Sequence, residues 1–78
     1  MSNIDKYEKV FFDNFPVDKA KLTNLKYNDI SEWDSIGHMT LIGDLESTFN
    51  IAIETDDIIE FSSYKKGIGI LKKYKVDI

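Results

Sequence analysis

Apolar residues recur every three or four positions in three stretches of the chain, which is the spacing of one face of an α-helix. The first stretch, residues 4–15, predicts a helix that ends before Pro16, because the residue before a proline avoids helical backbone angles. Ser2 or Asn3 is suitably placed to cap its start. Its predicted buried face consists of Ile4, Tyr7, Val10, Phe11 and Phe15.

Residues 16–33 follow without sustained periodicity and predict a long ordered loop, with a short turn around residues 18–22. Loops of this length are uncommon in small domains unless they serve a function. The loop is expected to be attached to the core by four apolar side chains, namely Leu22, Leu25, Tyr27 and Ile30.

The second periodic stretch predicts a helix over residues 35–50, with Asn50 as its stop. Gly37 and Gly43 lie off its apolar face, and each is expected to weaken the helix by about 0.5–1 kcal/mol relative to alanine. The predicted buried face consists of Met39, Ile42, Leu45 and Phe49, with Leu41 beside them.

A short third helix is expected over residues 56–61, after the inward-pointing Ile51 and Ile53. Thr55 is its expected cap, and the two acids in its first turn suit the positive end of the helix dipole.

The third periodic stretch predicts a final helix that Ser62 or Ser63 caps. Its core-facing residues are expected to be Tyr64, Ile68, Leu71 and Val76. Together these elements predict an all-α fold, a four-helix bundle with three longer helices, one short third helix and a long first loop.

The composition limits what this chain can be. Its 78 residues are expected to form a single domain, residues 1–78, and the absence of cysteine excludes disulfides and thiolate metal sites. All ten basic residues are lysines, and none lies between Tyr27 and Tyr64, a stretch that holds nine acids. This acidic stretch is either a solvated surface or a docking face for basic proteins. Nucleic acid is not an expected partner.

Nothing in the sequence predicts a membrane or secreted protein. The charged N-terminal stretch lacks the apolar segment of a signal peptide. No apolar run approaches the roughly 20 residues of a transmembrane helix. We therefore expect a monomeric cytoplasmic protein without stable membrane association.

Enzymatic and metal chemistry find little support in these residues. Ser35 and His38 would lie one helical turn apart, but no acid is placed to orient the imidazole and no glycine-rich oxyanion loop is visible. His38 is therefore expected to be a surface residue at a partner contact. The carboxylates do not follow the alternating spacing of a calcium-binding loop, so no metal site is expected.

Ser35 is suited to carry a phosphate-linked group. A serine in the first turn of a helix holds its hydroxyl near free backbone N–H groups and near the positive end of the dipole. Both would stabilise a phosphodiester attached there. The alternative is that Asp34 or Ser35 simply caps the helix, which is the commoner use of such residues.

The run from Trp33 to Leu71 resembles the acyl carrier proteins. Asp34-Ser35-Ile36 is similar to the family's Asp-Ser-Leu attachment motif, with isoleucine in place of leucine. The predicted helix order and the long first loop are also similar. The downstream residues that follow the family's Leu…Leu-Glu…Phe pattern and its apolar position before the third helix are Leu41, Leu45, Glu46, Phe49 and Ile53.

The resemblance implies that Ser35, flanked by the motif residues Asp34 and Ile36, carries a 4′-phosphopantetheine arm added by a phosphopantetheinyl transferase. The thiol of the arm would hold acyl groups as thioesters, so the chain itself would not be an enzyme. An acyl chain would shelter among nine apolar residues, namely Met39, Ile42, Leu45, Phe49, Ile53, Ile58, Phe61, Ile68 and Leu71.

The resemblance also implies partner enzymes with basic docking patches, namely a ligase that loads an acyl or aminoacyl group and enzymes that transfer it. The expected docking residues are Ile36, His38, Asp44, Glu46, Asp56 and Asp57.

Several positions depart from the family pattern. Gly37 and Thr40 stand where acids are common, and Glu54 stands where a proline is frequent. These departures favour a carrier in a specialised pathway, with general fatty-acid synthesis as the rival. Two other functions stay open: a carrier of aminoacyl or peptidyl groups, whose usual motif Glu32-Trp33 does not match, and an unmodified helical adaptor that acts by docking alone.

Overall fold

Five α-helices and no β-strand make up the protein, whose computed structural model describes all 78 residues. They are α1 (Asn3–Asn14), α2 (Lys19–Leu22), α3 (Ser35–Phe49), α4 (Thr55–Glu60) and α5 (Tyr64–Lys73). The predicted all-α fold is confirmed. The helix α2 is a single turn within the long first loop, where the sequence predicted a turn.

Side-chain caps explain where four of the helices begin. Ser2, Asp18, Asp34 and Ser63 each accept a hydrogen bond from the backbone N–H three residues later. Asn50 ends α3 in the left-handed conformation, as expected of a helix stop. The prediction for α4 is wrong in detail, because Thr55 is its first residue and Glu54 precedes it without a side-chain cap.

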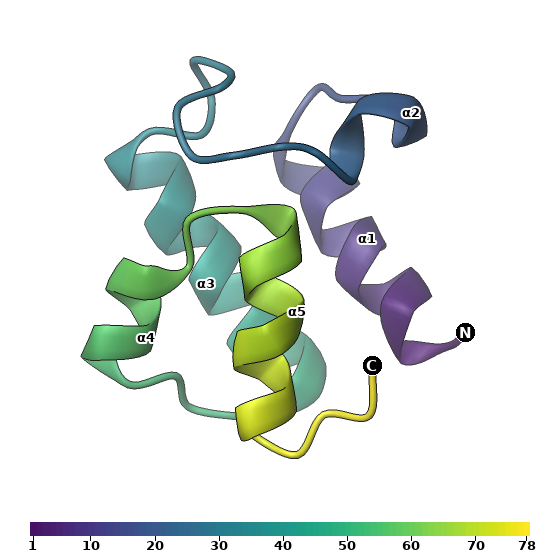
Figure 1. The fold of residues 1–78 in the computed structure, drawn as a ribbon, viewed down its shortest axis with the longest axis vertical. Coiled ribbons are helices and arrows are strands. Elements are labelled where there is room, and N and C mark those ends of the chain that lie inside the picture. The colour runs from purple at the N-terminus through teal and green to yellow at the C-terminus, as the bar shows by residue number, and fades with distance from the viewer.

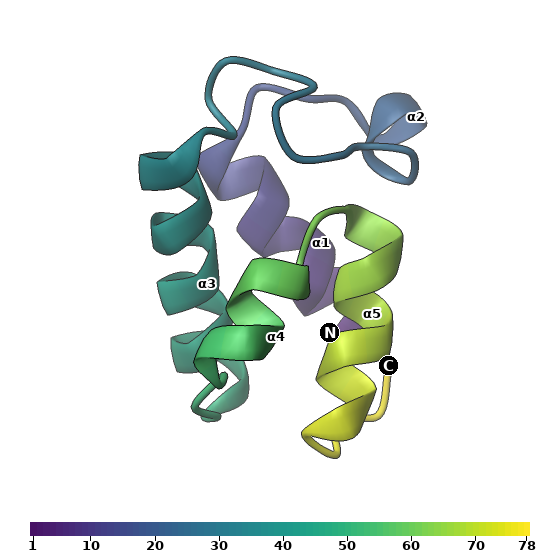
Figure 2. The same ribbon diagram turned by 60° about the vertical axis from the view of Figure 1, so that its left-hand side comes forward.

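The helices are arranged in a layer about two helices thick. The molecule measures 18 Å along its shortest axis, and a helix with its side chains is about 10–12 Å wide. The helix α1 packs along α3 (Figure 1). On the opposite side of the core, α4 lies between α3 and α5, and the long first loop passes over one end of the bundle (Figure 2).

The core is rich in aromatic rings, and its composition corrects part of the sequence prediction. The buried residues of α3 are Leu41, Ile42 and Leu45, whereas Phe49 is half-buried and Met39 is 56% exposed. The prediction that Met39 belongs to the buried face is therefore wrong. The buried aromatic residues are Tyr7, Phe11, Phe15, Trp33, Phe61 and Tyr64.

Buried hydrogen bonds join α1 to α5. The Tyr7 hydroxyl donates to the Tyr64 carbonyl oxygen at 2.7 Å, and the Tyr64 hydroxyl donates to Glu8 Oε2, also at 2.7 Å. Burial raises the pKa of both tyrosines above its ordinary value, and the neighbouring Glu8 adds to the shift of Tyr64. A side chain at Gly67 would overlap both the Tyr7 hydroxyl and the Phe61 ring, so α5 can approach this close only with a glycine there.

The long first loop is fastened to the segment before α5 by two backbone hydrogen bonds. The Tyr27 N–H donates to the Ser62 carbonyl at 2.9 Å, and the Tyr64 N–H donates to the Leu25 carbonyl at 3.0 Å. Of the four residues predicted to attach this loop to the core, Leu22 and Leu25 are buried and Ile30 is half-buried. The prediction is wrong for Tyr27, which is 37% exposed. These bonds keep the loop beside the start of α5.

Candidate functional site

Ser35 is the first residue of α3 and lies exposed at its start. The N-cap is Asp34, whose Oδ1 accepts from the Gly37 N–H at 2.8 Å. The sequence left open whether Asp34 or Ser35 caps the helix, and the structure assigns the cap to Asp34. The Ser35 hydroxyl therefore has no part in this cap. The first backbone N–H groups of α3 lack partners within the helix and lie at the same end of the helix as this hydroxyl.

Gly37 allows the chain before α3 to fold against the first turn of the helix. A side chain at this position would overlap the backbone carbonyl oxygen of Glu32. The sequence predicted only that Gly37 weakens the helix, and this tertiary contact was missed. Because of it, Trp33 is placed in the core immediately before the exposed Asp34 and Ser35.

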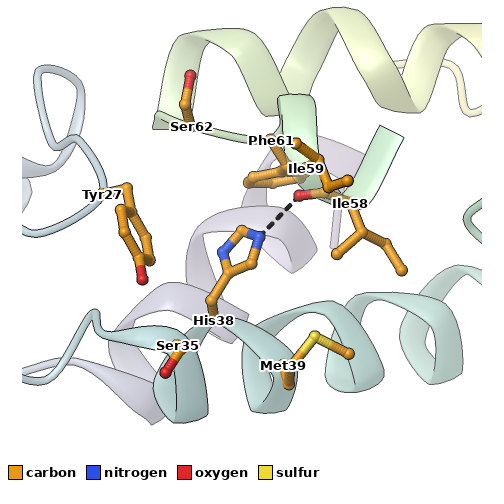
Figure 3. Close-up of a pocket in the computed structure, with 8 residues that line it drawn as sticks. All are labelled: Tyr27, Ser35, His38, Met39, Ile58, Ile59, Phe61 and Ser62. Carbon is orange, nitrogen blue, oxygen red and sulfur yellow. Dashed lines mark hydrogen bonds between the residues drawn. The ribbon is translucent and has the colours of Figure 1, made fainter. Parts of the chain in front are cut away.

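His38 is held by hydrogen bonds on both sides of its ring. The Trp33 indole N–H, which can only donate, lies 3.0 Å from Nδ1, so Nδ1 is the acceptor. Nε2 then carries the proton and donates to the Ile58 carbonyl oxygen of α4 at 2.8 Å (Figure 3). The prediction of a surface residue is wrong for His38, since the ring is half-buried and connects Trp33 to α4.

An open pocket of about 330 Å³ begins at Ser35 and is walled by the long loop, α3 and α4. In Figure 3 the His38 ring stands between α3 and α4, and Tyr27 lies across from it on the loop. Met39 follows His38 on α3, and its side chain runs along the helix away from the ring. No charged side chain lines this space. Its lining residues are Tyr27, Ser35, His38, Met39, Ile58, Ile59, Phe61 and Ser62.

The pocket contains three of the nine residues expected to shelter an acyl chain, namely Met39, Ile58 and Phe61. The other six do not line it. Four of these, Ile42, Leu45, Ile53 and Leu71, are buried in the core, and Phe49 and Ile68 are half-buried away from the pocket.

Tyr27, Ile59 and Ser62 line the pocket but were not among the expected cavity residues. The short α4 has too few residues for its pattern to show which of Ile58 and Ile59 faces outward. The positions of Tyr27 and Ser62 depend on contacts between distant segments.

Three large apolar side chains surround the Ser35 end of α3 and are exposed to solvent. Ile36 is 77% exposed, Ile59 72% and Met39 56%. We refer to these three residues as the apolar rim. The exposure of Ile36 agrees with the sequence prediction, and its role in docking stays a prediction.

The four acids expected to dock partners lie in two different environments. Asp44 and Asp56 are exposed, although Asn14 Nδ2 donates to Asp44 at 2.8 Å. Glu46 is half-buried and accepts from the Ile53 N–H at 2.8 Å, which fixes the turn after α3. Only the first pair therefore offers free acidic surface.

Asp57 is buried and belongs to the internal structure, which contradicts its prediction as a docking residue. Only 8% of it is exposed, and its carboxylate accepts from Lys73 Nζ at 2.6 Å and from the Tyr74 hydroxyl. The hydrogen bond from Lys73, followed by that from Tyr74, lowers the pKa of Asp57 below its ordinary value of 3.8. The Tyr74 hydroxyl also accepts from the Glu54 N–H at 2.9 Å, so this cluster joins α4 to the end of α5.

No group of three or more histidine or acidic side chains is placed to hold a metal ion. None of the five helices combines the length and the apolar character needed to cross a membrane. Comparison with known protein families, curated proteins and solved structures finds no match to this chain.

Proposed function

We propose that this protein is an acyl carrier that holds its cargo as a thioester on a 4′-phosphopantetheine arm attached to Ser35. The observation that carries this proposal is an exposed serine at the start of a 15-residue helix, excluded from the cap by Asp34 and opening on an apolar pocket. The resemblance of Asp34-Ser35-Ile36, and of the helix order predicted from the sequence, to acyl carrier proteins supports the same function.

The residues around Ser35 fit a phosphate-linked arm. The hydroxyl is exposed, and the N–H groups of Ser35 and Ile36 have no acceptor within the helix. These groups and the helix dipole stabilise a phosphodiester at this position. Asp34 supplies the capping bond that starts the helix at Ser35, so it would position the hydroxyl that carries the arm.

The pocket beside Ser35 fits an acyl cargo better than an aminoacyl cargo. Its volume of about 330 Å³ would hold about ten water-sized groups, at about 30 Å³ each. Met39, Ile58, Ile59 and Phe61 supply most of its wall, and no carboxylate is present to pair with an ammonium group. Burial of an unpaired charge in such a space is costly.

In this proposal the arm supplies the reactive thiol, and the chain supplies a fixed attachment point, a pocket and a docking surface. The partners are a phosphopantetheinyl transferase, a loading ligase and the enzymes that receive the acyl group. The exposed acids Asp44 and Asp56 and the apolar rim are the surfaces offered to them. With so few acids on α3, we propose a specialised pathway in preference to general fatty-acid synthesis.

Intact-protein mass spectrometry tests the proposal. After incubation with coenzyme A and a broad-specificity phosphopantetheinyl transferase, the wild type is expected to gain one arm and Ser35→Ala none. Ser47→Ala is the matched control, because Ser47 is an exposed serine of the same helix and its loss leaves the gain unchanged. No gain by the wild type, with a transferase that modifies another carrier in parallel, would favour an unmodified adaptor.

A further inference from the structure

The His38 side chain reaches across the Ser35 pocket from α3 toward α4 (Figure 3). Its ring lies nearly parallel to the Trp33 ring, with centroids 6.2 Å apart, and meets the Phe61 ring edge-on at 6.1 Å. Trp33 and Phe61 are fully buried members of the aromatic core. Phe61 lines the pocket itself and Trp33 does not, so His38 stands between the pocket and Trp33.

The His38 ring is fixed in this position from both sides. Rotation about its side-chain bonds would break the bond from the Trp33 N–H and the bond to the Ile58 carbonyl together. The indole N–H is buried, so it would be left without a partner, which disfavours such a movement. Because Trp33 precedes α3 and Ile58 belongs to α4, the same ring also sets the separation between two walls of the pocket.

We infer that His38 sets the depth of the pocket, so that the cargo is a short, uncharged acyl group that ends at this ring and does not enter the core. The identity of the cargo rests on the proposed function, whereas the depth of the pocket does not. With room for about ten water-sized groups, of which the thioester takes about two, the limit falls near eight carbons.

The test uses the full chain without an arm and the N-acetylcysteamine thioesters of fatty acids with four to twelve carbons. Binding to wild type, His38→Ala and His38→Gln is measured by titration, together with the melting temperature of each variant. Each buried methylene contributes about 0.8 kcal/mol, which is about fourfold in affinity. Wild-type affinity is expected to rise up to about eight carbons and then stay constant.

His38→Ala is expected to remove this limit. Its affinity should continue to rise with chain length, so that the twelve-carbon thioester binds at least tenfold more tightly than it binds the wild type. His38→Gln retains a side chain that can donate to the Ile58 carbonyl and is expected to keep most of the limit. Thr40→Ala, an exposed change on the same helix outside the pocket, is the matched control and should keep the wild-type profile.

A wild-type affinity that keeps rising to twelve carbons, or no binding at any length, would overturn the inference. So would a His38→Ala profile that levels off where the wild type does. If His38→Ala does not fold, the wild-type and His38→Gln series decide. Failure to add an arm to Ser35 refutes the carrier proposal alone, because the chain-length profile is measured on the unmodified protein.

The single tryptophan gives a second readout of the same inference. In His38→Ala, a long thioester that passes the former ring position reaches Trp33 and changes its fluorescence. In the wild type, lengthening the chain beyond eight carbons should produce no further change. A general loss of stability would lower the melting temperature without producing this dependence on chain length.

Discussion

The two sides of the core are built differently. Between α1 and α5, buried hydrogen bonds among Tyr7, Glu8 and Tyr64 close the interface. Between α3 and α4, one histidine connects the walls of an open pocket, and the apolar rim is exposed beside it. We refer to these as the closed side and the open side.

The difference shows how so small a domain can leave part of its apolar surface uncovered. Ile36 and Ile59 are mostly exposed and therefore contribute little to the apolar area that folding buries. Regions with few buried contacts open at lower free energy than the core does. The site of the proposed attachment lies on the open side.

The largest effect is expected at Gly67 on the closed side. In Gly67→Ala the new methyl group overlaps Tyr7 and Phe61, which are both fully buried, so we expect a loss of about 3 kcal/mol in the free energy of unfolding. Gly69→Ala is the control, because its methyl group meets open space and should stabilise α5 by about 0.5–1 kcal/mol. Urea denaturation measures both. Equal effects of the two changes would contradict the close packing of this side.

Tyr64→Phe should have the next largest effect. It removes the hydroxyl that donates to Glu8 and leaves a buried carboxylate oxygen without this partner, at a cost of about 1–3 kcal/mol. Tyr27→Phe removes a hydroxyl from the open side, where the residue is exposed, and should change stability by less than about 0.5 kcal/mol. Urea unfolding compares the two variants. Similar losses in their free energy of unfolding would contradict the difference between the closed side and the open side.

A smaller effect is expected at the start of α3, where two neighbouring residues have different roles. Asp34→Ala removes the capping bond to the Gly37 N–H and should cost about 0.5–2 kcal/mol. Ser35→Ala should leave the free energy of unfolding nearly unchanged, although it removes the proposed attachment site. Circular dichroism during urea unfolding compares them, and a larger loss for Ser35→Ala would show that the serine supports the helix after all.

The smallest effect concerns acid. The pKa of Asp57 is lower in the folded state than its ordinary value of 3.8, so the unfolded state binds the proton more tightly. Its stabilising contribution is present above about pH 4 and is lost as the pH falls through the folded pKa. Between pH 5 and pH 2, wild type should therefore lose more stability than Asp57→Asn. Parallel losses in the two proteins would show that the contacts with Lys73 and Tyr74 do not act through the charge of Asp57.

The helices could be predicted from the sequence because their signals are local. The spacing of apolar residues and the stop at Asn50 predicted residues 35–50, and the structure gives Ser35–Phe49. The glycines were judged only as weak helix formers. At Gly37 the decisive neighbour is the Glu32 carbonyl, which no periodic pattern shows.

The parts of the site that depend on tertiary contacts could not be predicted in this way. His38 was assigned to the surface because its partners, the Trp33 N–H and the Ile58 carbonyl, meet only in the folded chain. The resemblance implies docking for Asp57, and its pairing with Lys73, 16 residues away, is not visible in the sequence. In contrast, the position of Ser35 was predictable, since the start of a helix follows from its neighbours.

The two backbone hydrogen bonds that fasten the first loop also limit the local opening motions of the protein. The Tyr27 N–H and the Tyr64 N–H are held by the same pair of segments, so a movement that lifts the loop releases both. In hydrogen–deuterium exchange these two amides should exchange at one common rate. The loop therefore moves away from the start of α5 only when both bonds break together. While both loop amides stay protected, the loop wall of the pocket stays in place, and the bond between His38 and the Ile58 carbonyl holds the α4 wall opposite it.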